Sequence, residues 1–169
     1  MPAPTIHGFA EKVALVINGS EGIGRAVALQ LALLGCYVIV SYEKTSEEQT
    51  NALEELKSLG TLANAFQYSD SETLFNEVNQ LFGRLDLLVN CVKTETDSVS
   101  QIETITNEAL ELMKFRPKPT IANVISENQI VYFYPDLPNN FRQNCVVKKE
   151  KNQGLDATEK ELLRKLLTS

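Results

Sequence analysis

The chain has 169 residues, of which 43% are hydrophobic and 22% are charged, and this composition predicts one globular domain over residues 1–169. Its net charge of −6 argues against unspecific binding to nucleic acid and against attachment to an anionic membrane surface. No apolar run is long enough to span a bilayer, and the first residues lack the basic and apolar regions of a signal peptide, so we expect no membrane insertion.

Three cysteines, Cys36, Cys91 and Cys145, are widely spaced along the chain. An odd number at this spacing is typical of reduced thiols and not of a disulfide framework or a zinc site. We therefore expect buried thiols, no metal, and a location in the cytoplasm or an equivalent reducing compartment, such as an organelle matrix or stroma. His7 is the only histidine, and its place near the terminus predicts no catalytic role.

Strands and helices alternate along the chain. The apolar run 13–17 predicts a strand buried on both faces, and a glycine-containing loop separates it from a helix that ends at Gly35. In that helix Ala26, Leu29, Gln30 and Leu33 share one side. The further predicted strands cover 36–41, 62–67, 85–89, 120–126 and 141–147, and the further helices lie over 46–59, 71–82, 98–114 and 155–168. This alternation predicts a parallel sheet with right-handed crossovers.

The stretch 13–28, VALVINGSEGIGRAVA, contains the most informative motif. A strand, a glycine loop and a helix together present backbone N–H groups and a positive helix end to a pyrophosphate. The loop resembles the T-G-x-x-x-G-I-G loop of the short-chain dehydrogenase/reductase family, most closely the 3-oxoacyl-acyl-carrier-protein reductase branch. The family's threonine falls on Ile17 and its first glycine on Asn18, whereas Gly22, Ile23 and Gly24 match directly.

Three later stretches strengthen the resemblance. Residues 82–90, FGRLDLLVN, are similar to the family's F-G-x-[LI]-D-x-L-V-N, although the following N-N-A-G reads Asn90-Cys-Val-Lys93 here. Residues 120–126 resemble the family's fifth strand and place Ser126 on the catalytic serine, and residues 141–147 resemble its sixth strand. The resemblance covers 11–92 well and 120–147 more loosely. It implies a Rossmann-like, doubly wound α/β fold of about six parallel strands that lacks the family's last strand.

The family's catalytic helix carries Tyr-x-x-x-Lys between the fifth and sixth strands. Here that interval reads ENQIVYFYPDLPNN, and no tyrosine of the chain is followed four residues later by lysine. The resemblance therefore implies that the catalytic helix is missing and that no catalytic set survives beyond the aligned Ser126. Tyr132 and Tyr134 could donate a proton, but an aromatic run is more often packing material. Asn107 is a weak counterpart of the family's relay asparagine.

The resemblance also places a cofactor site. Glu43 follows the second strand, where the reductases carry a basic residue for the 2′-phosphate of NADP, and an acid there suits the 2′-hydroxyl of NAD instead. The family's adenine contact falls on Ser69 or Asp70. We therefore expect NAD(H) or no dinucleotide, with NADP less favoured. The residues assigned to the cofactor are Asn18, Ser20, Gly22, Ile23, Gly24, Glu43 and Asn90.

Without that helix, the apolar strands 120–126 and 141–147 must be covered by residues 130–137, by the C-terminal helix or by another protein, because a parallel sheet normally has both faces covered. An apolar face of this size that stays uncovered would mark an interface. We predict a catalytically inactive family member that acts as a binding or structural subunit, pairing through that face with an active relative or a larger complex. Two alternatives remain: an NAD(P)-dependent reductase with displaced catalytic groups, and a dinucleotide-binding sensor without turnover.

Overall fold

The structure is a computed structural model that describes residues 9–91, 98–126, 137–148 and 164. For residues 98–99, 125–126 and 144–148 the description is limited to the backbone. Predictions for His7, Lys93, Tyr132, Tyr134 and nearly all of the 155–168 helix lie outside the described residues.

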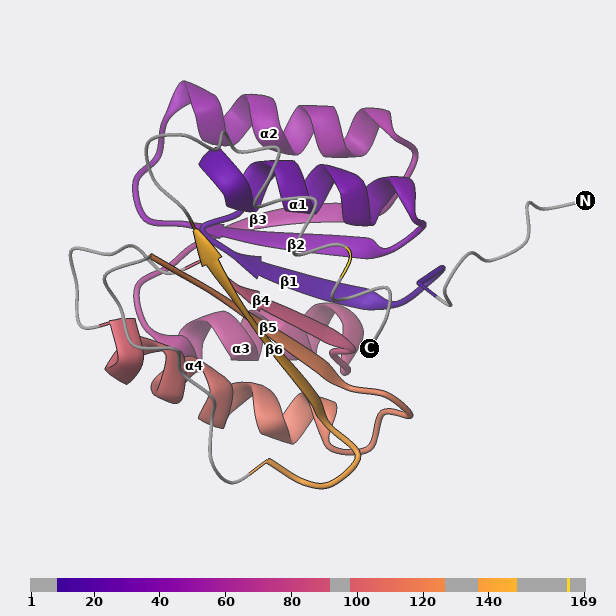
Figure 1. Cartoon of the computed structure of the whole chain (residues 1–169). Helices are drawn as coiled ribbons and strands as arrows, with labels where there is room; N and C mark the ends of the chain where they lie inside the picture. The colour runs from indigo at the N-terminus through magenta and orange to yellow at the C-terminus, as the bar shows by residue number, and fades with distance from the viewer. Residues whose placement is uncertain (1–8, 92–97, 127–136, 149–163, 165–169) are drawn as a thin grey trace, which may run out of the picture.

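The strands of the described residues form one parallel sheet in the order β3-β2-β1-β4-β5-β6 (Figure 1). The chain runs outward from β1 to β3, returns to β4 beside β1, and continues outward to β6, which confirms the predicted doubly wound fold. The elements are β1 (Val13–Ile17), α1 (Gly22–Leu33), β2 (Tyr37–Tyr42), α2 (Glu47–Ser58), β3 (Ala63–Gln67), α3 (Ser71–Phe82), β4 (Leu87–Asn90), α4 (Ser98–Met113), β5 (Thr120–Ser126) and β6 (Arg142–Lys148).

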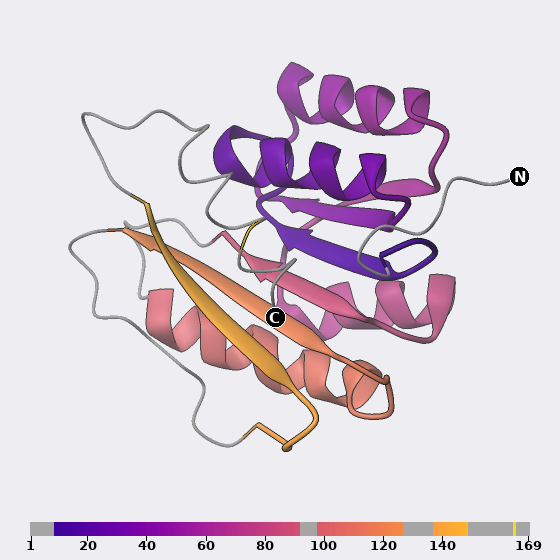
Figure 2. The same ribbon diagram turned by 45° about the vertical axis from the view of Figure 1, so that its right-hand side comes forward.

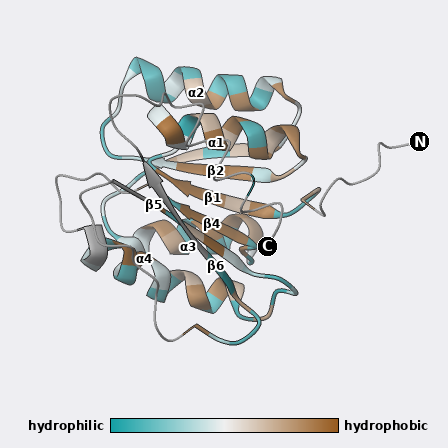
Figure 3. Ribbon diagram, in the orientation of Figure 1, coloured by the Kyte–Doolittle hydropathy of each residue, from teal (hydrophilic) through white to brown (hydrophobic). Residues whose placement is uncertain are grey.

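Helices lie on both faces of the sheet, α1 and α2 on one and α3 and α4 on the other (Figure 1, Figure 2). Side chains alternate along β1, so Ala14 and Val16 pack toward α1 whereas Val13, Leu15 and Ile17 pack toward α3 and α4. All five residues are buried, which explains why β1 is a continuous apolar run and not an alternating one (Figure 3).

The helix ends follow from their sequences. The Ser46 side chain accepts a hydrogen bond from Gln49 N and begins α2, and Gly83 adopts a left-handed conformation that ends α3, as predicted. Helical spacing also predicts that Leu33 and Leu81 lie on the apolar sides of their helices, and both predictions are wrong. Leu33 is 62% exposed and Leu81 is 47% exposed, because α1 and α3 bury neighbouring stripes. The buried residues of α1 are Ile23, Gly24, Val27, Ala28, Leu31 and Ala32.

The predicted strand boundaries differ from the observed ones by one or two residues at β2, β3, β4 and β6. Cys36 precedes β2 and is fully buried, and this burial raises the pKa of its thiol to about 12. Cys91, which follows β4, is only half-buried, so the prediction that all the thiols are buried is too strong. No helix among the described residues is long and apolar enough to cross a membrane.

Candidate functional site

The loop after β1 lies at the carboxyl edge of the sheet, which we define as the edge where the parallel strands end. It sits between β2 and β4, the point where the strand order reverses. Asn18 N donates to Ser41 Oγ at 3.1 Å, and the Asn18 side-chain amide donates to Cys91 O at 2.8 Å. The loop is therefore attached to both neighbouring strands, where open α/β sheets place their ligands.

Two residues set the path of the backbone here: Asn18 in the loop and Gly24 in the first turn of α1. Asn18 has a φ of 57°, a left-handed conformation that Asn adopts more readily than most residues. A Cβ atom at Gly24 would lie 2.2 Å from Asn18 O, so only glycine lets the first turn of α1 approach the loop this closely. Asn18 thus takes the place of the family's glycine without losing the bend.

Gly19 belongs to the same construction, although the sequence reading assigned it no role. Its Cβ would lie 2.6 Å from Val40 Cγ1 on β2, and its N–H donates to Ser41 O at 3.1 Å. The only signal in the sequence is a small residue two positions after the end of a buried strand. Such a residue becomes interpretable once β2 is known to lie beside the loop.

The amino end of α1 differs from those of α2 and α3. Ser46 and Asp70 cap the latter two through side-chain hydrogen bonds, and both helices carry acidic residues in the first turn. The α1 N-cap, Glu21, makes no such bond, and no acid lies in the first turn of α1. The N–H groups of that turn and the positive end of the helix dipole therefore suit an anion.

The predicted loop residues come together at this helix end. Asn18, Ser20 and Ile23 are buried, whereas Gly22 is exposed with a φ of +56° and has no atom within 4 Å of a Cβ built on it. Gly22 therefore borders open space at the tip of the loop, whereas Asn18, Ser20 and Ile23 are packed inside the protein.

Glu43 follows β2 at the same edge and is partly exposed. Its backbone oxygen accepts a hydrogen bond of 3.0 Å from the Gln67 amide at the end of β3. This contact joins the ends of β2 and β3. The Glu43 carboxylate therefore belongs to the same sheet edge as the loop after β1.

Of the two predicted adenine contacts, Asp70 has a structural task. Its carboxylate accepts hydrogen bonds from Thr73 N at 2.8 Å and Thr73 Oγ1 at 2.9 Å, which begin α3. The bond from the Thr73 backbone N–H is the largest of the effects that lower the pKa of Asp70. The Asp70 carboxylate thus caps the amino end of α3.

Asn90 is fully buried at the end of β4. Its amide donates to Asn123 Oδ1 at 2.9 Å, and Asn123 in turn donates to Gln143 Oε1 at 3.3 Å. The side chains therefore link β4, β5 and β6 on one face of the sheet. Asn90 Oδ1 has no partner among the described residues. The contribution of Asn123 was not recognised, because a cross-strand pair cannot be read from spacing along one chain.

Ser126 ends β5 and lies in register with Lys148 of β6. Residues 127–141 connect the two strands, and Leu137–Phe141 is irregular with a turn. The place where the family carries its catalytic helix falls on residues 127–136, which lie outside the described residues, so the loss of that helix stays a prediction from the sequence. Asn107, the weak relay candidate, is exposed on α4.

Among the described residues, no group of three His, Cys, Asp or Glu side chains is placed to hold a metal ion. The polar groups at the carboxyl edge are instead amides, hydroxyls and the carboxylates of Glu21, Glu43 and Asp70. This set suits hydrogen bonding to an organic ligand.

A family model described as short chain dehydrogenase matches residues 12–116. A short-chain dehydrogenase/reductase of Pestalotiopsis microspora is 37% identical over 105 residues, which cover 59% of this chain and 39% of that protein. A 3-oxoacyl-[acyl-carrier-protein] reductase of Staphylococcus aureus is 40% identical over 84 residues, 47% of this chain and 34% of the reductase. The chain thus spans about two fifths of the length of the curated relatives it matches.

Solved structures agree with the fold. The complex of Pseudomonas aeruginosa RhlG with NADP matches with a TM-score of 0.63 at 21% identity and covers 73% of this chain and 58% of RhlG. A short-chain dehydrogenase from Burkholderia cenocepacia in complex with NADP matches with a TM-score of 0.61 at 26% identity and covers 70% of this chain and 57% of that one. The family model spans well over half of the sequence. The chain belongs to the short-chain dehydrogenase family.

Proposed function

We propose that the chain binds a nicotinamide dinucleotide at the carboxyl edge, with the pyrophosphate at the amino end of α1. The observation that carries this proposal is the approach of Gly24 to Asn18 O beside a helix end without a side-chain cap. This geometry leaves the backbone N–H groups of the first turn of α1 to donate hydrogen bonds to an anion. Membership of the family supports it, as does the NADP in the 26% identical Burkholderia cenocepacia structure.

We further propose that NAD(H) is preferred over NADP(H). Glu43 lies directly after β2, and its negative charge would repel a 2′-phosphate while it can accept a hydrogen bond from a 2′-hydroxyl. The solved neighbours include complexes with either cofactor. The discrimination in this chain therefore depends on Glu43 itself.

The chain does not carry the family's own proton donor under this proposal. Reduction of a carbonyl requires a proton at the forming alkoxide, and a positioned acid accelerates that step by orders of magnitude. Tyr-x-x-x-Lys is absent from all 169 residues. A chain that binds a dinucleotide without this pair would act as a binding or structural subunit, in a reducing compartment that keeps the buried Cys36 thiol reduced.

The proposed pairing with another subunit, an active relative or a larger complex, uses the outer part of the sheet. The side chains of Ile121, Ala122 and Val124 in β5 are already buried, whereas Arg142 and Gln143 of β6 are partly exposed. The outermost strand β6 is therefore the part of the predicted face that we assign to the partner.

The first experiment is calorimetric titration of the full chain with NADH and NADPH. We expect micromolar binding of NADH and weaker binding of NADPH. Gly22→Ala should weaken NADH binding at least about tenfold, because its methyl group enters the space at the helix end. Gly60→Ala is the matched control: Gly60 also has a positive φ and open surroundings, but it lies after α2. Absence of NADH binding at millimolar concentration contradicts the proposal.

Glu43→Gln tests cofactor choice. We expect the ratio of NADPH to NADH affinity to rise severalfold, because the repulsive charge is gone. Glu54→Gln, a surface charge change within α2, should leave the ratio unchanged. If the ratio of NADPH to NADH affinity is unchanged in Glu43→Gln, Glu43 does not determine the choice of cofactor. The proposal that the chain binds a dinucleotide would still stand.

Turnover distinguishes a binding subunit from the second candidate, a reductase with displaced catalytic groups. That candidate rests on the retained Ser126 and on Tyr132 and Tyr134, which follow it within a few residues. We expect no ketone-dependent NADH oxidation by the wild-type chain. Oxidation that disappears in Tyr132→Phe or Tyr134→Phe would establish the reductase and refute the inactive subunit. If the chain binds NADH but neither oxidises it nor binds a partner protein, the sensor without turnover becomes the favoured function.

A further inference from the structure

The opposite edge of the sheet, where the strands begin, carries an unusual loop between α4 and β5. Residues 114–118 read Lys-Phe-Arg-Pro-Lys, and we call them the KFRPK loop. Phe115 is 87% exposed, the largest exposure among the described large apolar side chains that lie on the surface. Lys114 Nζ lies 5.2 Å from the centroid of its ring. A large aromatic side chain held in water in this way is typical of an anchor for a partner.

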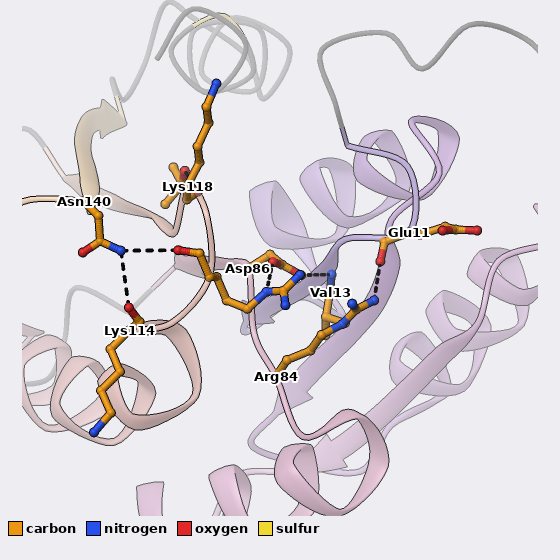
Figure 4. Close-up of polar contacts among 9 residues, drawn as sticks. Glu11, Val13, Arg84, Asp86, Lys114, Lys118 and Asn140 are labelled. Atoms are coloured by element: carbon orange, nitrogen blue, oxygen red, sulfur yellow. Dashed lines mark hydrogen bonds and ion pairs between the residues drawn. The ribbon is translucent and has the colours of Figure 1, made fainter.

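The KFRPK loop is held rigidly although Phe115 is exposed. Arg116 Nε pairs with the buried Asp86 Oδ1 at 2.6 Å, and Asp86 Oδ2 accepts Val13 N at 2.9 Å (Figure 4). From the other side, the Asn140 amide donates to Lys114 O and to Arg116 O, each at 3.3 Å (Figure 4). A loop that is already ordered loses little conformational entropy when it binds a partner.

The charge of the KFRPK loop is opposite to that of the whole chain. Lys114, Arg116 and Lys118 place three cations within five residues of a chain whose net charge is −6. The described acids in contact with them are Asp86, which is buried beneath Arg116, and Glu111, which pairs with Lys114 at 2.9 Å. Lys118 is exposed. Three cations against these two acids leave one excess positive charge beside Phe115, in a chain that is otherwise anionic.

We propose that the KFRPK loop is a docking site for an acidic segment of another protein, which covers Phe115 with apolar side chains and places carboxylates on Lys114 and Lys118. Aromatic and basic side chains at the centre and rim are what such an interface needs. A lipid surface is a poorer match, because one aromatic ring inserts little apolar area and the rest of the chain is anionic.

This site is independent of the proposed dinucleotide site. The KFRPK loop precedes β5 at the edge where the strands begin, whereas Asn18 and Glu43 follow β1 and β2 at the edge where they end (Figure 1). The length of the sheet separates the two, so a partner at Phe115 leaves the amino end of α1 accessible.

The test is selection of a displayed library of random peptides on the immobilised full chain. We expect the recovered peptides to combine Asp or Glu with Leu, Ile, Val or Phe. Phe115→Ser should weaken binding of a labelled recovered peptide at least about tenfold. Leu33→Ser, which changes another exposed apolar side chain at 62% exposure, should leave binding unchanged.

Charge is tested separately. Lys118→Gln should weaken the same peptide about threefold, whereas Lys57→Gln, at the end of α2, should not. Binding should also weaken with added salt, because the screening length falls from about 10 Å at 0.1 M to about 3 Å at 1 M. Gly22→Ala should bind the peptide normally even where it fails to bind NADH, which keeps the two proposals distinguishable.

Four results would overturn the proposal. Recovered peptides without acidic residues, or equal binding by Phe115→Ser, would remove the KFRPK loop as the site. Sedimentation of the chain with phosphatidylserine vesicles in a Phe115-dependent manner, without acidic peptides from the library, would assign it to a membrane. Self-association that Phe115→Ser abolishes, again without acidic peptides, would assign it to a second copy of the chain.

Discussion

At the edge where the strands begin, a buried carboxylate and an arginine connect the strands, whereas at the centre of the carboxyl edge neutral amides and a hydroxyl do so. Asp86 joins Val13 of β1 to Arg116 after α4. Asn18 donates a hydrogen bond to Cys91 O, and Asn90 donates one to Asn123 Oδ1. The first turn of α1, which follows the Asn18 loop, has no side-chain cap. We therefore expect the Asp86 contacts to contribute more to stability than the amide contacts at the carboxyl edge, where we propose that the dinucleotide binds.

The largest expected effect comes from Asp86→Ala. The substitution leaves the buried Val13 N–H without an acceptor and Arg116 without its partner, so we expect a loss of about 3 kcal/mol in the free energy of unfolding. Urea unfolding measures it. Glu111→Ala removes a comparable acid from an exposed pair with Lys114 and should cost less than about 0.5 kcal/mol. Similar losses in both variants would refute the contrast between buried and exposed pairs.

At the carboxyl edge, Gly24→Ala should cost about 2 kcal/mol. Alanine favours a helix, but its Cβ would lie 2.2 Å from Asn18 O, so α1 has to move away from the loop. Thermal unfolding and NADH titration should both report the change. If Gly24→Ala is as stable as wild type, the loop and the helix are not as tightly coupled as the structure indicates.

The amide chain across β4, β5 and β6 should contribute less. Asn123→Ala removes the acceptor of Asn90 and the donor to Gln143 in a fully buried position, and we expect a loss of about 1.5 kcal/mol. Gln143→Ala removes one longer bond at a partly exposed position and should cost about 0.5 kcal/mol. Equal losses would show that Asn90 and Asn123 do not act as a buried pair.

The smallest effect concerns pH. The pKa of Asp70 is lowered by its bonds to Thr73, so its contribution to stability is present above the unfolded pKa of about 3.9 and is lost as pH falls through the lower folded value. Asp70→Asn should therefore flatten the acid limb of the thermal midpoint below about pH 4. An identical acid limb in wild type and variant would show that this cap does not contribute.

The sequence predicted local features well and long-range ones poorly. The bounds of α3 and β5 are exact, since capping residues, Gly83 and an apolar run define them within a few positions. The predicted side of α1 differs from the observed one, because the helix buries the stripe that contains Val27 and Leu31 and leaves Leu33 62% exposed. The joint role of Asp86, Val13 and Arg116 depends on strands that are distant in sequence. No local pattern reveals it.

The Asp86 contacts also bear on how the chain acquires its structure during synthesis. Val13 and Asp86 are 73 residues apart, and Arg116 lies 30 residues further on. The central strand β1 therefore emerges from the ribosome long before its partner β4, and its second flank stays unpaired until then. Such distant pairing slows folding and exposes intermediates to aggregation. A nascent chain halted before Arg116 should depend on chaperones more strongly than one halted beyond it.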